Sequence, residues 1–135
     1  MKLGLFLTDF YIFSNCTGTT EEEIMTINSP NYPNDYPTET TCMWQLRVPM
    51  GRLIKLHFED FKIEKYHDQL FIYDVIEENL VSDETLLENL SGEDTPDPIE
   101  LYENKIRLIF VTDSSVTKKG FRIRYEGTSI NLIFM

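Results

Sequence analysis

Residues 58–73 read FEDFKIEKYHDQLFIY and join two strand-like runs through an acidic loop. Before the loop, apolar and polar residues alternate from Ile54 to Glu59, the period-two pattern of a strand with one buried face. After the loop, Leu70 and Ile72 repeat this pattern. The alternation predicts two strands, and it leaves the residues between them on a loop.

Three carboxylates of the chain stand on predicted loops. The loop in residues 58–73 carries Glu64 and Asp68, and the acidic turn Thr112-Asp113-Ser114-Ser115 follows another apolar run. Carboxylate oxygens are the ligands that hard cations take in proteins. We therefore expect a hard-cation site near Glu64, Asp68 and Asp113.

Length and charge limit the classes of function. The 135 residues form one domain by the usual prior, and 12 basic against 23 acidic residues give a formal charge of -11. Such a surface repels nucleic-acid phosphates and anionic lipid, so neither is expected as a partner. Cations and basic proteins are compatible with it, although acidity can also serve solubility alone.

The two cysteines, Cys16 and Cys42, form no Cys/His cluster of the kind that binds zinc. They are either a disulfide or two free thiols. A disulfide would close a loop of roughly 26 residues, contribute about 3 kcal/mol and imply an oxidising compartment. The sequons at Asn15 and Asn89 are possible glycosylation sites and point to the same compartment.

Residues 1–14 open like a signal peptide, with one positive charge followed by apolar residues. Asp9 interrupts the apolar run, and no small-x-small cleavage site follows. The alternatives are an N-terminal extension, an imperfect start site or a cut piece of a longer secreted chain. The chain has no run of about 20 apolar residues, so we expect no membrane span.

Short alternating segments recur along the rest of the chain. We expect strands at Ile24–Ile27, Cys42–Val48, Gln69–Ile76, Ile99–Tyr102, Lys105–Val111 and Gly120–Tyr125. Trp44 lies on the inward side of its strand. Strands at short spacing, with no helical period and no internal repeat, predict an all-β fold, an antiparallel two-sheet β-sandwich.

The segments between these strands read as turns and loops. Pro49-Met50-Gly51 predicts a hairpin into the strand before the acidic loop, and Glu103-Asn104 predicts a tight turn. Residues 28–37 hold three prolines and three asparagines and predict an ordered turn system. Glu77–Pro98 is polar and predicts a loop, with Leu86 and Leu87 covering an end of the core.

Taken together, these residues resemble the pattern of a CUB domain. The match runs in order from Cys16 to about Tyr125, and it predicts a CUB domain at residues 15–127 with a C-terminal tail at 128–135. The shared positions are Cys16, Ser29-Pro30-Asn31-Tyr32-Pro33, Tyr36-Pro37, Cys42-x-Trp44, Pro49-x-Gly51, Leu56-x-Phe58-x-x-Phe61-x-Ile63-Glu64, Asp68-x-Leu70-x-Ile72, Ser91-Gly92, Phe110-x-x-Asp113-x-Ser115 and Gly120-Phe121.

The resemblance implies an extracellular, non-catalytic protein-recognition module with a jelly-roll fold and a disulfide between Cys16 and Cys42. In calcium-binding members, the ion is held by acidic positions that fall here on Glu64, Asp68 and Asp113. Members of the family often bind a lysine of a partner protein at these carboxylates. The hydroxyls of Tyr66 and Ser115 are then possible partner-binding groups beside the ammonium.

Two departures from the family pattern stand out. The second disulfide of the family is missing, and Lys65 and Ser91 occupy roughly the places of its cysteines. The loop between Glu64 and Asp68 has three residues, fewer than is usual in calcium-binding members. A short loop either holds the two carboxylates close together or pulls one of them away from the ion.

No enzyme class fits the sequence well. Glu64 and Asp68 as a glycosidase pair would need a substrate cleft and one raised pKa, which a small lone sandwich rarely supplies. His57 and His67 are the only histidines, and for both we expect a structural or solvent-exposed role. The alternatives to a calcium-stabilised recognition module are a calcium-free structural spacer and, more remotely, a lectin-like carbohydrate binder.

Overall fold

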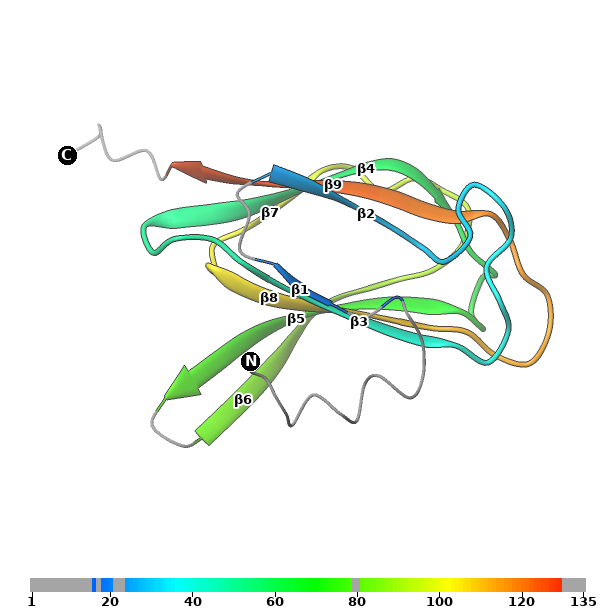
Figure 1. Ribbon diagram of the computed structural model, residues 1–135, viewed down its shortest axis with the longest axis horizontal. Helices are drawn as coiled ribbons and strands as arrows, with labels where there is room; N and C mark the ends of the chain where they lie inside the picture. Colours follow the sequence, from blue (N-terminus) through cyan, green and yellow to red (C-terminus); the bar gives the residue numbers. More distant parts are fainter. Residues whose placement is uncertain (1–15, 17, 21–23, 79–80, 130–135) are drawn as a thin grey trace.

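The computed structural model describes residues 16, 18–20, 24–78 and 81–129, and it forms a sandwich of two β-sheets (Figure 1). One sheet has five strands in the order β1-β3-β8-β5-β6, and the other has four in the order β2-β9-β4-β7. The strands are β1 (Gly18–Thr20), β2 (Ile24–Asn28), β3 (Thr41–Arg47), β4 (Arg52–Lys62), β5 (Gln69–Glu78), β6 (Val81–Leu90), β7 (Ile99–Leu101), β8 (Lys105–Val111) and β9 (Gly120–Ser129).

This architecture confirms the predicted all-β sandwich and its strands. All pairings between described strands are antiparallel except that of β1 with β3, which is parallel. Cys16 and Cys42 form the disulfide, with their Cα atoms 5.2 Å apart, and it ties the start of β1 to β3. The possible signal segment at residues 1–14 and the sequon asparagine Asn15 lie outside the described residues. So does the tail after Ser129.

Alternating side chains build the core between the two sheets. In β8, Ile106, Leu108 and Phe110 are fully buried, as their period-two spacing predicts. In β4 the spacing changes, because a register shift between Phe58 and Asp60 lets Phe58 and Phe61 both face inward. The Phe-x-x-Phe spacing in the sequence therefore reflects a β-bulge in β4.

Phe121 is the centre of an aromatic cluster within this core. Its ring centroid lies 5.0 Å from that of Phe110, 5.9 Å from Trp44 and 6.3 Å from Phe61. Tyr36, in the segment between β2 and β3, packs edge-on against Phe110 with ring centroids 5.0 Å apart, so this segment also contacts the cluster. Full burial of a phenylalanine side chain is worth about 1.5–3 kcal/mol, so this cluster is a large part of the driving force for folding.

The connection at Pro49-Met50-Gly51, predicted as a hairpin, instead joins the two sheets, so that prediction is wrong, and the predicted tight turn at Glu103-Asn104 joins the two sheets as well. β3 and β4 lie in different sheets, joined by Pro49-Met50-Gly51, and β7 and β8 also lie in different sheets. The two crossovers bind each other, because the Val48 backbone N–H donates to the Asn104 carbonyl at 2.8 Å. Alternation shows which face of a strand is buried but not which strand lies beside it.

The segment Glu77–Pro98, predicted as a polar loop, contains the ten-residue strand β6, so that prediction is also wrong. β6 is an edge strand paired with β5, and its charged side chains face solvent, which hides the apolar alternation. Beyond Asp74, the last β5 residue paired with β8, the β5–β6 hairpin projects from the sandwich (Figure 1). Leu87 packs against the core as expected, whereas Leu86 is 51% exposed.

A close backbone contact fixes the start of β9. The buried Ser29 hydroxyl accepts a hydrogen bond from the Phe121 backbone N–H at 2.9 Å, and the Ser29 N–H donates to the Phe121 carbonyl at 3.1 Å. A Cβ at Gly120 would lie 1.8 Å from the Ser29 hydroxyl oxygen, and Gly120 has a φ of +88°. Both the space and the backbone conformation therefore require glycine at this position.

Gly120→Ala should lower the free energy of unfolding by about 2–5 kcal/mol, the sum of a left-handed backbone penalty and a steric clash. Gly51→Ala is the matched control, because Gly51 has the same φ of +88° with open space around its Cα. It should cost only about 1–2 kcal/mol. Urea unfolding of both variants measures the difference, and equal losses would show that the contact with Ser29 is unimportant.

Candidate metal centre

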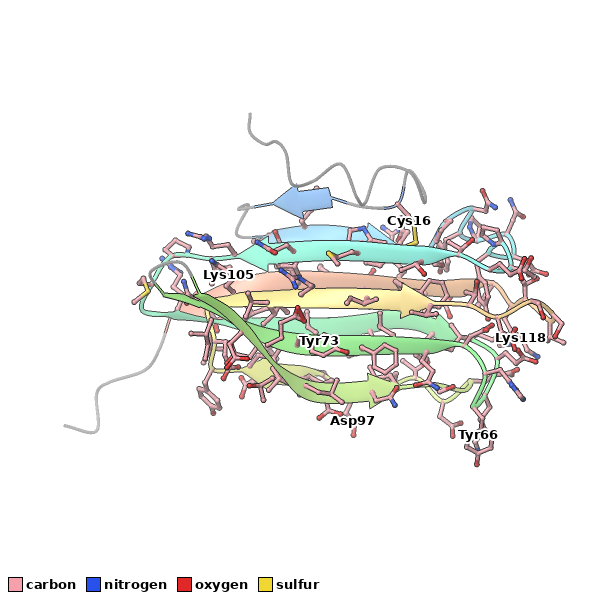
Figure 2. The ribbon with its side chains drawn as sticks, turned by 90° about the horizontal axis from the view of Figure 1, so that it is seen from below. Cys16, Tyr66, Tyr73, Asp97, Lys105 and Lys118 are labelled. Atoms are coloured by element: carbon pink, nitrogen blue, oxygen red, sulfur yellow. A yellow bond between two sulfur atoms is a disulfide. The ribbon has the colours of Figure 1, made fainter. Side chains whose placement is uncertain are left out.

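Three connections meet at one end of the sandwich, which we call the site end. They are the turn between β4 and β5, the connection between β8 and β9, and the segment between β2 and β3. Tyr66 of the first connection and Lys118 of the second are labelled there in Figure 2. Backbone hydrogen bonds join the connections: the Tyr36 N–H donates to the Lys118 carbonyl at 3.0 Å, and the Glu39 N–H to that of Asp113 at 2.8 Å.

The short turn after β4 is closed by its own backbone. The Asp68 N–H donates to the Glu64 carbonyl at 3.0 Å, and Tyr66 in the middle of the turn has a left-handed φ of 71°. The Ser91 hydroxyl accepts from the Tyr66 N–H at 2.9 Å and lies 2.8 Å from the Asp68 carbonyl. Ser91 therefore anchors the turn by hydrogen bonds.

Asp68 is completely buried beneath the turn and joins all three connections. Its Oδ2 accepts a hydrogen bond from the Tyr36 hydroxyl at 2.6 Å, and its Oδ1 accepts one from the Asp113 backbone N–H at 2.9 Å. The Tyr36 hydroxyl in turn accepts from the Glu64 N–H at 3.0 Å. A buried carboxylate is costly unless it is hydrogen-bonded, and here both oxygens are.

Burial raises the pKa of the Tyr36 hydroxyl, and the hydrogen bond to Asp68 raises it further. The phenol therefore keeps its proton across the physiological pH range. It acts as a permanent donor to Asp68.

Glu64 and Asp113 come together above Asp68, and His67 joins them. One ligand atom from each of these three residues lies within 4.8 Å of the other two. The His67 Nδ1 is 3.6 Å from the Asp113 Oδ2, and the Asp113 Oδ1 accepts from the Ser115 backbone N–H at 3.2 Å. Among the described residues, no other group of three or more possible metal ligands lies this close together.

In the described part of the chain, Glu64 lies close to the carboxyl groups of Asp113 and Asp68, and also near His67 and Lys118. Its Oε1 is buried and has no hydrogen-bond partner there. Burial raises the pKa of the Glu64 carboxyl, and the neighbouring charges of Asp113 and Asp68 raise it further. A carboxylate of this kind is a strong candidate for cation binding, because an ion would satisfy the oxygen and offset the repulsion.

The residues present fit a calcium ion in their chemistry. Glu64 and Asp113 offer carboxylate oxygens to a common point, and Asp68 lies directly below with both oxygens already hydrogen-bonded. Of the possible partner-binding residues, Tyr66 is 74% exposed with Lys65 Nζ 5.1 Å from its ring centroid, and Ser115 is exposed next to Asp113. The sequon residue Asn89 is exposed on β6.

Sequence reasoning missed three residues of this site. His67 was expected to be structural or in solvent, Tyr36 was assigned only to an ordered turn system, and Ser91 was considered only as a lost cysteine. The signal for His67 was the shortness of the loop. The turn closes between Glu64 and Asp68, and His67, just before Asp68, is therefore brought back toward Glu64. The roles of Tyr36 and Ser91 depend on contacts 32 and 23 residues distant in sequence, which no local pattern contains.

On β4, the carboxylate of Asp60 is paired with a lysine. The Asp60 Oδ2 lies 2.6 Å from the Tyr32 hydroxyl and 2.7 Å from the Lys119 Nζ. Burial alone would raise the pKa of the Asp60 carboxyl, but its hydrogen bonds with Lys119 and Tyr32 outweigh burial and lower it. Asp60 is therefore satisfied without a cation, in contrast to Glu64.

Tyr36→Phe should lower the free energy of unfolding by about 1–3 kcal/mol, because it removes a donor from a carboxylate that has no access to water. Tyr32→Phe is the matched control, since Asp60 keeps its contact with Lys119 and is partly exposed. It should cost clearly less. Chemical unfolding measures both, and an equal loss in the two variants would contradict the role given to Asp68.

Asp60→Asn should destabilise the protein at pH 7 by about 0.5–1 kcal/mol, because the ion pair is partly exposed. The folded pKa lies below the unfolded value of about 3.9, so the ionised form stabilises the fold above that pH. The difference from wild type should vanish as the pH falls through the lowered pKa. Urea unfolding between pH 7 and pH 2 measures it, and a difference that does not depend on pH would contradict the ion pair.

Comparison with known proteins places this arrangement in a family. Residues 16–125 match the family model described as CUB domain. Bone morphogenetic protein 1 of Xenopus laevis is 38% identical over 112 residues, which cover 82% of this chain and 16% of that protein. Cubilin of Rattus norvegicus is 38% identical over 105 residues, which cover 75% of this chain and 3% of that protein.

A solved structure supports the fold. The structure described as the MASP-1 CUB2 domain bound to Ca2+ superimposes with a TM-score of 0.70 at 28% identity, covering 81% of this chain and 96% of that chain. The present chain thus has the extent of one such domain and spans less than a fifth of the curated relatives named above. Among the described residues, no helix is long and apolar enough to cross a membrane.

Proposed function

This chain belongs to the CUB domain family, and we propose that its site end is a calcium-stabilised recognition site for basic segments of extracellular proteins. CUB domains are generally non-catalytic protein-interaction modules. The observation that carries the proposal is Glu64: a buried oxygen without a partner, next to Asp113 and above Asp68. Calcium supplies the positive charge that this oxygen set lacks.

In this proposal, calcium orders the site by joining segments that are otherwise linked only by hydrogen bonds. Glu64 comes from the turn after β4 and Asp113 from the connection after β8, so an ion held by both fixes the two connections to each other. Asp68 stays below them as the common anchor. The net charge of -11 further favours uptake of a divalent cation.

The ammonium group of a partner's lysine is the ligand that suits such a site. Carboxylates held by a metal are fixed in position and keep outward lone pairs, so they accept hydrogen bonds from an ammonium group at a small ordering cost. Tyr66 belongs to the same turn as Glu64, and the backbone N–H of exposed Ser115 donates to the Asp113 Oδ1 at 3.2 Å. Because charged contacts are screened by salt, binding should weaken as ionic strength rises.

Calcium should raise the melting temperature of the wild-type protein. The free energy of unfolding should rise by about 2.7 kcal/mol at a free calcium concentration 100 times the dissociation constant. Asp113→Ala should remove this response. Asp97→Ala, which removes an exposed aspartate on the connection after β6, should keep it. Calorimetry that detects no calcium binding at millimolar concentration would overturn the proposal and favour a calcium-free spacer.

The partner chemistry is tested in the same calcium buffer. A short peptide with a central lysine should bind to wild type and Asp97→Ala, and the same peptide with that lysine acetylated should not. Binding of both peptides, or binding that survives Asp113→Ala, would contradict recognition of the ammonium group. Binding to a sugar array that survives Asp113→Ala would favour the lectin-like alternative.

A further inference from the structure

One row of side chains crosses the outer face of the five-stranded sheet and ends at the edge strand β6. Met43 on β3 lies opposite Ile109 on β8, and Ile109 lies opposite Phe71 on β5. Phe71 in turn lies opposite Asn89 on β6. The residues on either side of Phe71 in β5 are fully buried, so Phe71 points away from the core. Three apolar side chains therefore lead across the sheet to one asparagine.

This row remains partly exposed. Met43, Ile109 and Phe71 are each half-buried, and the described residues form two layers, so no described element covers the outer face. Tyr73 extends the apolar surface, because its ring centroid is 6.2 Å from that of Phe71. Figure 2 is seen from the side of this sheet and labels Tyr73 on it. A continuous apolar surface of this kind is typical of a place that another group covers.

Asn89 is open to chemical modification. It is the first residue of the sequon Asn89-Leu90-Ser91, and it is exposed. Its side-chain amide makes no hydrogen bond with any described residue. The disulfide between Cys16 and Cys42 agrees with folding in an oxidising compartment of the secretory route, which is also where sequons receive glycans.

We infer that Asn89 carries an N-linked glycan whose first sugar packs on Phe71 and covers the apolar row. The donor is a lipid-linked oligosaccharide. The Asn89 Nδ2 forms a bond to C1 of the first N-acetylglucosamine, and the bond from C1 to the pyrophosphate breaks. The lipid pyrophosphate leaves, and one amide proton is released. No group of the candidate metal centre takes part in this step.

The register places the sugar within reach of the ring. Directly opposite residues of an antiparallel pair have Cβ atoms about 4.5–5.5 Å apart, so a sugar on the Asn89 Nδ2 begins beside Phe71. One face of such a sugar is lined by C–H groups. This face packs on an aromatic ring, because the contact removes apolar area of both from water. Tyr73 widens the ring surface on which the sugar lies.

The surface beside the row is polar and already paired. Arg107, opposite Tyr73 in the register, contacts Glu84 on β6 and donates a hydrogen bond to the Gln45 Oε1 at 3.0 Å. These groups have partners within the fold. The apolar area that a glycan can cover is therefore the row and Tyr73.

A glycan at this position also protects the edge of the sheet. β6 has ten residues and pairs with β5 on one side. An unpaired edge of this length is a place where a further strand can add. A bulky, hydrophilic group on Asn89 hinders such an approach. The same modification thus covers an apolar face and blocks an open edge.

The experiment secretes the full chain from animal cells that build high-mannose glycans, with Asn15→Gln in every protein to remove the other sequon. Peptide mass spectrometry should find Asn89 occupied. An endoglycosidase then trims the glycan to one N-acetylglucosamine, and the same sequence made in the bacterial periplasm provides the sugar-free form. The sugar should raise the melting temperature by roughly 2–6 °C, the shift expected when a contact of the strength of an aromatic pair is gained.

Phe71→Val should abolish this rise, because it removes the ring on which the sugar packs. Tyr102→Val is the matched control, since Tyr102 is an exposed tyrosine in the connection after β7, and it should keep the rise. In the trimmed wild type, nuclear Overhauser contacts should join the sugar C–H protons to the Phe71 ring. This measurement needs no variant.

An unmodified Asn89 in the secreted protein would overturn the inference. So would a sugar that raises the melting temperature equally in wild type and Phe71→Val, or a sugar without contacts to the Phe71 ring. Self-association of the glycosylated protein that Phe71→Val abolishes would assign the row to a second copy of the chain, and would also overturn it.

Discussion

One buried carboxylate holds the site end together. Asp68 accepts hydrogen bonds from the Tyr36 hydroxyl and from the Asp113 backbone, so a single side chain connects segments that are far apart in sequence. Because Asp68 has no contact with water, each of these donors is needed to offset the cost of burying its charge. The positions of Glu64 and His67 follow from it, since both belong to the turn that Asp68 closes.

The acidic residues of the chain divide into those that are neutralised within the fold and those that are not. Glu59 contacts Arg122 and Arg124, and Asp60 contacts Lys119, so these carboxylates are parts of a surface network. Glu64 lies only four residues beyond Asp60, but it has Asp113 and Asp68 as neighbours. The local surroundings of each carboxylate, more than the total charge, determine where a cation is attracted.

Much of the fold was predictable because strands with one buried face impose a period of two on the sequence. The strands around Phe58, Leu108 and Phe121 could all be located in this way. Strand pairing could not, since the same alternation suits a hairpin and a crossover, and the crossover next to Val48 was therefore mistaken. β6 was missed because an edge strand exposes most of its side chains.

The site was predictable to the extent that its residues are acidic and stand on loops. Glu64 and Asp113 were expected to meet and do so, but the hydrogen bonds that occupy Asp68 depend on Tyr36, whose hydroxyl reaches the site only through tertiary packing. His67 was discounted because no second histidine accompanies it. What brings it into the centre is the geometry of a closed turn, which composition does not reveal.

The anchoring of the turn by Ser91 has a consequence for the redox behaviour of the site. Where a disulfide supports a loop, the shape of the loop depends on the oxidation state of its surroundings. Here the Ser91 hydroxyl and two backbone carbonyls hold the turn, and no sulfur atom takes part. Reduction of the Cys16–Cys42 disulfide removes none of these contacts, so the candidate metal centre does not depend on the thiol chemistry of its environment.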